Sequence, residues 1–308
     1  MKTSMPIPVF LLILASPVFG QQLDSEPNFP VKAELFIDAF SGSEGITFNA
    51  EGHLFIAADK GAWRVYPNGK VTRITDTYSN LGMARIGDRD ILMADFGPTM
   101  FLDGPNDDGI IWRITPEGDK KVIAKGIADP NFILVRKDGT FLVSDDGTDK
   151  IYLVEANGSV DVWTSAIPYP NGMAFSKDES TIYVAQIFKQ LDPILFDNTV
   201  WAIPVDDDGQ PSGEPTLAGR VGEGGVDGLT MDEMGRIYVA DNRGGKIWRI
   251  DPSSGESILI TENVANVASL VFGEGNFDHE SIYATSTFRG GGKIWKVDVG
   301  VRGAPLNQ

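Results

Sequence analysis

Cysteine is absent from this 308-residue sequence, and histidine occurs only twice, as His53 and His279. Without cysteine the chain has no disulfides, thiol nucleophiles, zinc–thiolate centres or iron–sulfur clusters. Two histidines that lie far apart in the sequence also argue against a transition-metal site built from imidazoles. These absences exclude most of the common catalytic and metal sites.

Positive charge is scarce as well, because 26 Lys and Arg residues face 43 Asp and Glu residues, for a formal net charge of −17. A chain this acidic repels nucleic-acid phosphates and anionic lipid headgroups. Beyond the first twenty residues, no segment approaches the ~18 consecutive apolar residues of a membrane-spanning helix. We therefore expect no nucleic-acid partner and no membrane insertion.

The first twenty residues differ from the rest of the chain. A polar start with Lys2 precedes a mostly apolar run from Pro6 to Ala15, and the segment ends at the small residue Gly20. An apolar run of about ten residues is too short to cross a bilayer. The pattern predicts a signal peptide over residues 1–20 and a secreted or periplasmic single domain over residues 21–308. A buried N-terminal strand or a short anchor is the alternative.

One short pattern recurs six times along the chain. It consists of an apolar strand, a turn, a second strand that ends in Ala or Ser and usually Asp, and an aromatic-rich third strand. Six copies in the mature chain give about 48 residues per repeat, and no segment has helical periodicity over ten or more residues. Turn signals such as Asn68–Gly69 and Asp138–Gly139 separate the strands. The repeats predict an all-β, six-bladed β-propeller, with a stacked solenoid as the alternative.

The sixth repeat lacks a fourth strand. Its strands are expected near residues 267–272, 282–285 and 293–297, and the chain then ends. The segment Lys32–Phe40 precedes the first repeat and belongs to no other blade. We predict that this N-terminal strand closes the last blade, because closure removes a free sheet edge.

The residues that open the inner strands form a candidate metal site. In a propeller the first strand of each blade lines the central tunnel, so the starts of these strands converge on the axis. Two of the six positions are apolar, Leu81 and Val267, and four carry side-chain oxygens: Glu44, Asn131, Asn171 and Asp227. Two carboxylates and two amide oxygens suit a hard divalent cation, which would also offset the repulsion between the carboxylates. The alternative is that these side chains only cap strands and turns.

The segments SEGITF, DPNF, YPNGMAFSKD and GVDGLTMDEMGRIYVAD resemble the senescence marker protein/gluconolactonase/luciferin-regenerating family. The resemblance spans residues 38–300. It implies a six-bladed propeller that binds calcium or another divalent ion in its tunnel, with ligands at Glu44, Asn131, Asn171 and Asp227. It also implies that Asp227 acts as a general base or proton shuttle. The chain departs from the family at Asp129–Pro130, where sugar lactonases place an arginine, and this departure puts a sugar substrate in doubt.

Further residues are predicted to contact the substrate. The second strands end on the same face at oxygen-bearing residues that include Asp145, Gln186 and Asp241. Two insertions, at residues 96–109 and 187–198, leave the chain on that face and carry Phe101 and Phe188. Apolar side chains on such loops favour a cover over the tunnel mouth that admits a substrate less polar than a free sugar. A contact between blades or between two copies of the chain is the alternative.

The combined prediction is a secreted, divalent-metal-dependent hydrolase, and the resemblance favours a gluconolactonase-like lactonase with a small-molecule substrate. Calcium is the expected cofactor, with magnesium, manganese and zinc as alternatives. The cation would polarise the ester carbonyl, and Asp227 would accept a proton from the attacking water. A phosphotriesterase-like hydrolase and a non-catalytic binding propeller with a structural ion are the two alternatives. The sequence makes no prediction of oligomeric state.

Overall fold

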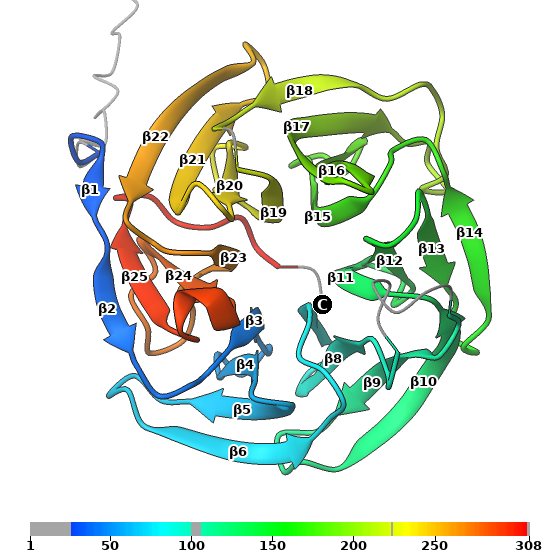
Figure 1. Ribbon diagram of the computed structural model, residues 1–308, viewed down its shortest axis with the longest axis horizontal. Coiled ribbons are helices and arrows are strands. Elements are labelled where there is room, and N and C mark those ends of the chain that lie inside the picture. The colour runs from blue at the N-terminus through cyan, green and yellow to red at the C-terminus, as the bar shows by residue number, and fades with distance from the viewer. Residues whose placement is uncertain (1–25, 100–105, 223, 307–308) are drawn as a thin grey trace, which may run out of the picture.

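Six sheets, antiparallel apart from one added N-terminal strand, lie around a central axis in the computed structural model, which describes residues 26–99, 106–222 and 224–306 (Figure 1). The described residues contain strands and a single 3-10 turn, η2 (Phe288–Gly290). The predicted all-β, six-bladed propeller is therefore confirmed. The predicted signal peptide, residues 1–20, lies outside the described residues.

Each sheet forms one blade, and its four strands follow one another outward from the axis in chain order, except in blade six. Blade one contains β3 (Ser43–Phe48), β4 (Leu54–Ala58), β5 (Gly61–Val65) and β6 (Val71–Asp76). Blade two contains β7 (Met83–Ile86), β8 (Asp90–Asp95), β9 (Gly109–Ile114) and β10 (Lys120–Ile127). Blade three contains β11 (Pro130–Val135), β12 (Phe141–Asp145), β13 (Ile151–Val154) and β14 (Val160–Thr164).

The second half of the ring repeats this arrangement. Blade four contains β15 (Pro170–Phe175), β16 (Thr181–Leu191), β17 (Ile194–Pro204) and β18 (Thr216–Arg220). Blade five contains β19 (Val226–Met231), β20 (Ile237–Asp241), β21 (Lys246–Asp251) and β22 (Glu256–Glu262). Blade six contains β23 (Val267–Phe272), β24 (Ser281–Ser286) and β25 (Ile294–Asp298), and its outer strand comes from the N-terminal segment.

That outer strand is β2 (Glu34–Ile37), which runs antiparallel to β25 with Leu35 opposite Trp295. The predicted closure of the last blade is confirmed, although the strand is shorter than Lys32–Phe40. The repeat pattern did not predict β1 (Val31–Lys32), which pairs in parallel with β22 and adds a fifth strand to blade five. The N-terminal segment therefore joins two neighbouring blades.

Glu26 fixes the start of the described chain to blade five. Its carboxylate lies 2.5 Å from an Arg236 guanidinium nitrogen and 3.1 Å from one of Arg249. Partial burial raises the pKa of Glu26, but hydrogen bonds and charge from the two arginines outweigh it, so the pKa is lowered overall. None of the helical structure in the described residues is long and apolar enough to cross a membrane.

Six buried apolar clusters hold the ring together, and each lies between two neighbouring blades. The middle strands are apolar on both faces because each face packs on a different neighbour. β4 (LFIAA) illustrates this, since all five of its residues are buried. Its Leu54, Ile56 and Ala58 pack toward blade six, and its Phe55 and Ala57 pack toward blade two.

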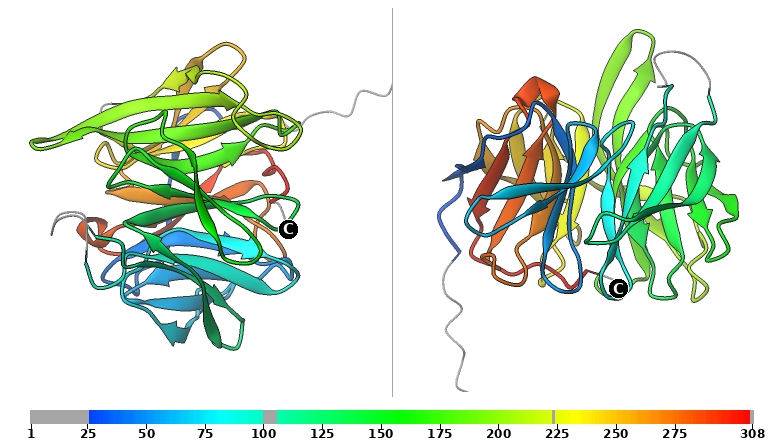
Figure 2. Two further views of the ribbon diagram at one scale, coloured as in Figure 1. Left: turned by 90° about the vertical axis from the view of Figure 1, so that its right-hand side faces the viewer. Right: turned by 90° about the horizontal axis from the view of Figure 1, so that it is seen from below.

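The propeller has two different faces. The inner strands begin on one face, here called the ring face, from which the β16–β17 hairpin projects (Figure 2). The described part of the chain ends on the opposite face, here called the tail face, where residues 302–306 cross below the tunnel. Backbone hydrogen bonds of 2.9 Å from Glu233 to Arg302 and from Ala304 to Met231 hold this tail against the end of β19 and the turn that follows it.

Candidate functional site

The four predicted ligand residues occupy one equivalent position on four inner strands. Glu44, Asn131, Asn171 and Asp227 are the second residues of β3, β11, β15 and β19, respectively, at the ring face. In blade six this position belongs to Ala268 and not to Val267, because Val267 pairs with Ser286 as Val226 pairs with Asp241. The position remains apolar in blade six, so the pattern of four polar and two apolar residues is unchanged.

Glycines that follow Glu44, Leu81, Asn171 and Asp227 allow the inner strands to approach one another closely. A Cβ atom on Gly45, Gly82, Gly172 or Gly228 would lie only 2.1–2.6 Å from a backbone carbonyl oxygen of the next blade. For Gly172 that oxygen belongs to Asp227, at 2.4 Å, and for Gly82 it belongs to Asn131, at 2.3 Å. Such distances exclude any side chain without backbone movement. The glycines therefore bring the four polar residues, here called the axial ring, together around the axis.

The two carboxylates of the axial ring carry strongly perturbed pKa values. Burial raises the pKa of Asp227 to about 7, against the opposing effect of a hydrogen bond from Asn242. Burial, followed by repulsion from Asp227 and Asp146, raises the pKa of Glu44 well above its usual range. Negative charge on this ring is costly without a counter-charge. A bound cation would remove that cost.

The donor chemistry of the axial ring fits a hard divalent cation. All four side chains offer oxygen, and the Oδ1 atom of Asn171 is buried without a hydrogen-bond partner. An unsatisfied buried carbonyl oxygen is costly unless something binds it. No group of three or more Asp, Glu, His or Cys side chains suited to a metal ion occurs among the described residues. Ring coordination would therefore combine two carboxylates with amide oxygens.

Two residues that sequence reasoning missed support the axial ring. Asp146 Oδ2 accepts a 3.0 Å hydrogen bond from Asn131 Nδ2, and Asn242 Nδ2 donates a 3.0 Å hydrogen bond to Asp227 Oδ2. Asp146 is 5% exposed, and burial, followed by repulsion from Asp145, Asp129 and Asp227, raises its pKa well above the usual range. The available signal was a shared spacing, since each supporting residue follows its ring residue by fifteen positions.

The residues that end the second strands bind tryptophan indoles. Their side-chain oxygens accept hydrogen bonds from the Nε1 atoms of third-strand tryptophans, at 2.8 Å for Asp95 and Trp112, 2.9 Å for Gln186 and Trp201, 3.3 Å for Asp241 and Trp248, and 3.0 Å for Ser286 and Trp295. In blade one, Trp63 donates to the Ala58 carbonyl at 2.8 Å. These polar residues therefore fasten the third strand to the second within each blade. The substrate contacts of Gln186 and Asp241 stay predictions.

Blade three breaks this pattern. Tyr152 pairs with Val143, at the position where the other blades have tryptophan. Asp145 consequently has no indole to bind, and its buried Oδ2 atom has no hydrogen-bond partner. Burial raises the pKa of Asp145, against hydrogen bonds from Thr148 and backbone amides. The substrate contact of Asp145 stays a prediction.

The two insertions differ in structure. Phe101 lies outside the described residues. The second insertion is not a loop, because β16 and β17 continue as a paired hairpin to Leu191 and Ile194, with bulges on either side of Phe188 (Figure 2). The Phe188 ring is 8% exposed and packs against Phe196, at 5.2 Å between ring centroids. The exposed apolar surface lies farther out, at Ile194 and Leu195, which are 44% and 46% exposed.

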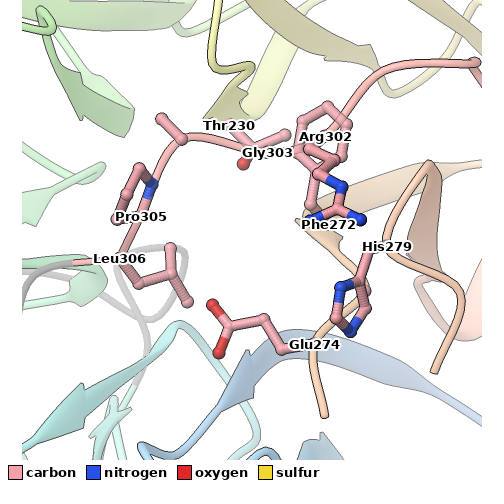
Figure 3. A pocket seen from close by; sticks show the side chains of 10 residues that line it. Thr230, Phe272, Glu274, His279, Arg302, Gly303, Pro305 and Leu306 are labelled. Atoms are coloured by element: carbon pink, nitrogen blue, oxygen red, sulfur yellow. The ribbon is translucent and has the colours of Figure 1, made fainter. Parts of the chain in front are cut away.

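The tail face is closed by the end of the chain. Residues of the tail line a cavity of about 180 Å³ beside Glu274 and His279 (Figure 3). Ala304, Pro305 and Leu306 also border an apolar cavity of about 390 Å³ in the lower tunnel. His279 faces this side, where its Nε2 atom lies 3.0 Å from the Gly275 carbonyl oxygen. The described tail therefore lies at the tail-face end of the tunnel.

Fold and site together define the class: a six-bladed propeller with a ring of oxygen-bearing side chains at one end of its tunnel. Comparison with known families matches residues 142–288 to the SMP-30/gluconolactonase/LRE-like region. The family resemblance predicted from the sequence is thereby confirmed.

Individual relatives are distant. The chain is 29% identical over 129 residues to regucalcin of Xenopus laevis, which is 41% of this chain and 40% of regucalcin. It is 23% identical over 223 residues to pentonolactonase XacC of Haloferax volcanii, which is 65% of this chain and 73% of that protein. The match to Xenopus regucalcin thus spans less than half the length of that relative.

Solved structures share the fold over most of their length. A calcium-binding protein, regucalcin, of Agrobacterium tumefaciens superposes with a TM-score of 0.71 at 20% identity, covering 91% of this chain and 97% of the other. A gluconolactonase of Xanthomonas campestris gives a TM-score of 0.69 at 18% identity, covering 86% and 88%. At such identities the likeness establishes the propeller architecture alone.

Proposed function

We propose that this protein hydrolyses lactones with the help of a divalent cation bound at the axial ring. Calcium is the expected cation. The observation that carries the proposal is the ring itself. Two carboxylates, the half-buried Glu44 and the buried Asp227, share it with Asn171, whose buried amide oxygen has no protein partner. The similarity to a pentonolactonase and the match to the SMP-30/gluconolactonase/LRE-like region support lactones as the substrate class.

Each residue has a defined task in this proposal. Glu44, Asn131, Asn171 and Asp227 hold the cation, which supplies positive charge where the ester carbonyl develops negative charge. Asp227 accepts a proton from the attacking water. Burial raises the pKa of the metal-free Asp227 to about 7, and a bound cation would lower it, so the carboxylate would be ionised and able to accept a proton at neutral pH. Asn242 donates a 3.0 Å hydrogen bond to Oδ2 of Asp227, which fixes the orientation of this carboxylate.

The ring face favours a lactone that is less polar than a sugar lactone. The hairpin beside the tunnel mouth exposes Ile194 and Leu195, and Asp129 stands where an arginine is expected for sugar substrates. We also propose that residues 1–20 are removed on export, which N-terminal sequencing of the exported protein tests directly. A chain that retains Met1 after export would contradict cleavage.

The experiment is a rate comparison on a panel of sugar lactones, alkyl lactones and one phosphotriester. We expect calcium-loaded protein to hydrolyse lactones, and Asp227→Asn to lower kcat by about 10²- to 10⁴-fold. Asp161→Asn, on the exposed outer strand of blade three, is the matched control and should keep the wild-type rate.

Three outcomes separate the alternatives. Faster cleavage of the phosphotriester than of every lactone would replace the proposed substrate class. Calcium-dependent stabilisation without turnover on any substrate would favour the binding propeller. Full lactonase activity in Asp227→Asn would remove the role given to this carboxylate.

A further inference from the structure

Blades three and five hold their ring residues with the same pair of groups in opposite order. In blade three the ring residue is an amide, Asn131, and its supporting residue is a carboxylate, Asp146. In blade five the ring residue is a carboxylate, Asp227, and its supporting residue is an amide, Asn242. The two pairs are equivalent in register, because Pro130 lies opposite Asp145 and Val226 lies opposite Asp241.

The hydrogen-bond partners fix which way each amide points. Asn242 Nδ2 faces two acceptors, Asp227 Oδ2 and the Val267 carbonyl oxygen, each at 3.0 Å. Only an NH2 group satisfies both. Asn131 faces the Asp146 carboxylate at 3.0 Å, so its NH2 group must lie on that side. Its Oδ1 atom is thereby turned away from Asp146.

We propose that Asp146 is a positioning residue that makes Asn131 present its amide oxygen, and not its NH2 group, to the cation of the axial ring. The inference rests on the proposed function, because it requires a cation at that ring. An amide is nearly symmetric in shape but opposite in polarity at its two ends. Without a fixed acceptor behind it, Asn131 can turn and offer hydrogen atoms to a positive ion.

The burial of Asp146 supports this role. Its carboxylate is 5% exposed, forms no ion pair among the described residues, and lies close to the carboxylates of Asp145, Asp129 and Asp227. Such an arrangement destabilises the metal-free fold, so packing alone does not explain a carboxylate here. Outer hydrogen bonds that orient metal ligands commonly change metal affinity by about 10- to 100-fold.

The test is calcium affinity, measured by titration calorimetry on the chelator-stripped full-length chain, together with the Tm of the metal-free form. Asp146→Leu keeps the side-chain size but removes the acceptor, and we expect calcium to bind about 10- to 100-fold more weakly. The metal-free Tm reports folding separately, because Asp146→Leu relieves crowding with Asp145, Asp129 and Asp227 but leaves the Asn131 NH2 group without its acceptor. A packing role for Asp146 predicts a lower Tm with unchanged calcium affinity.

Exchanging the amide of Asn131 and the carboxylate of Asp146 should restore calcium affinity. The double variant Asn131→Asp/Asp146→Asn copies the blade-five pair, with an NH2 group behind a ring carboxylate, and should bind calcium at least as tightly as the wild type. Asp146→Asn alone should fall between the wild type and Asp146→Leu, because two facing amides can pair either way round. Asp161→Asn serves as the control and should match the wild type.

The outcomes are distinguishable. Wild-type calcium affinity in Asp146→Leu, or a double variant as weak as Asp146→Leu, would overturn the positioning role while leaving the proposed function intact. No calcium binding by the wild type would overturn both. If Asp146→Leu does not fold, the double variant decides: a folded protein with wild-type affinity supports the proposal, and one with at least tenfold weaker affinity contradicts it.

Discussion

Replacing Gly172 with alanine places one methyl group between the inner strands of blades four and five. The new Cβ would lie 2.4 Å from the Asp227 carbonyl oxygen, 2.6 Å from the Leu229 nitrogen and 2.8 Å from the Gly228 carbonyl carbon. All three atoms belong to the backbone of blade five, so no side chain can rotate away. The inner strands of blades four and five must move apart.

The free-energy cost of Gly172→Ala follows from these backbone contacts. Inserting a methyl group into a tightly packed site costs about 1–3 kcal/mol, and rigid backbone on the receiving side places this case at the upper end. With a Tm change of about 2–4 °C per kcal/mol for a large domain, we expect a fall of about 6–12 °C. Calcium affinity should fall as well, because the displaced strand carries Asp227.

The assay is thermal unfolding of chelator-stripped Gly172→Ala, followed by circular dichroism, with Gly213→Ala as the control. Gly213 is exposed, and its added Cβ would meet only the Cγ atom of Pro204 at 3.1 Å. The control should stay within about 1 kcal/mol of the wild type. If both variants melt at the same temperature, close packing of the glycines does not set the spacing of the axial ring.

Two further predictions concern stability away from the ring. Gln186→Leu leaves the Trp201 indole N–H without its 2.9 Å acceptor, and should lower the free energy of unfolding by about 1–3 kcal/mol. Adding Trp201→Phe should recover part of this lost stability. A loss of kcat at unchanged Tm would instead favour a substrate contact for Gln186. Glu26→Gln removes a carboxylate whose pKa is lowered on folding, so the wild-type advantage in Tm should be present above pH 4.5 and disappear as the pH falls below the lowered pKa. Because the Glu26 side chain is 34% exposed, the advantage should stay below about 1 kcal/mol, and an advantage that persists at pH 2 would contradict the arginine pairing.

The repeat made the architecture predictable from the sequence. Turn signals and strand patterns recur at one spacing, and the missing sixth outer strand pointed to the N-terminal segment that became β2. The axial ring was predictable for the same reason, since Glu44, Asn131, Asn171 and Asp227 open equivalent strands. Repetition converts a weak local signal into a strong one.

What escaped prediction depends on contacts between strands. Asp146 follows the last residue of β12 and reads as part of a turn, and only the register of β11 with β12 places it behind Asn131. The use of Gln186 as an indole acceptor depends on Trp201, which reaches it across the β16–β17 pairing. β1 is two residues long and pairs with a strand some 230 positions away. No local pattern encodes such partners.

The long β16–β17 hairpin of blade four was also not predicted from the sequence. Residues 187–198 lack a glycine and contain Pro193, so the segment resembled a loop insertion. In the structure, Phe188 and Phe196 pack together and extend the pairing of β16 and β17 beyond the blade. Bulges around Phe188 break the simple alternation of apolar and polar residues.

The most direct test of the proposed chemistry is a calcium titration in which binding and lactone hydrolysis are followed on the same chelator-stripped sample. The proposal predicts one calcium ion bound per chain, no turnover before addition, and a rate that rises in proportion to occupancy. Full turnover in the stripped protein, or complete calcium binding without hydrolysis of any lactone, would contradict it.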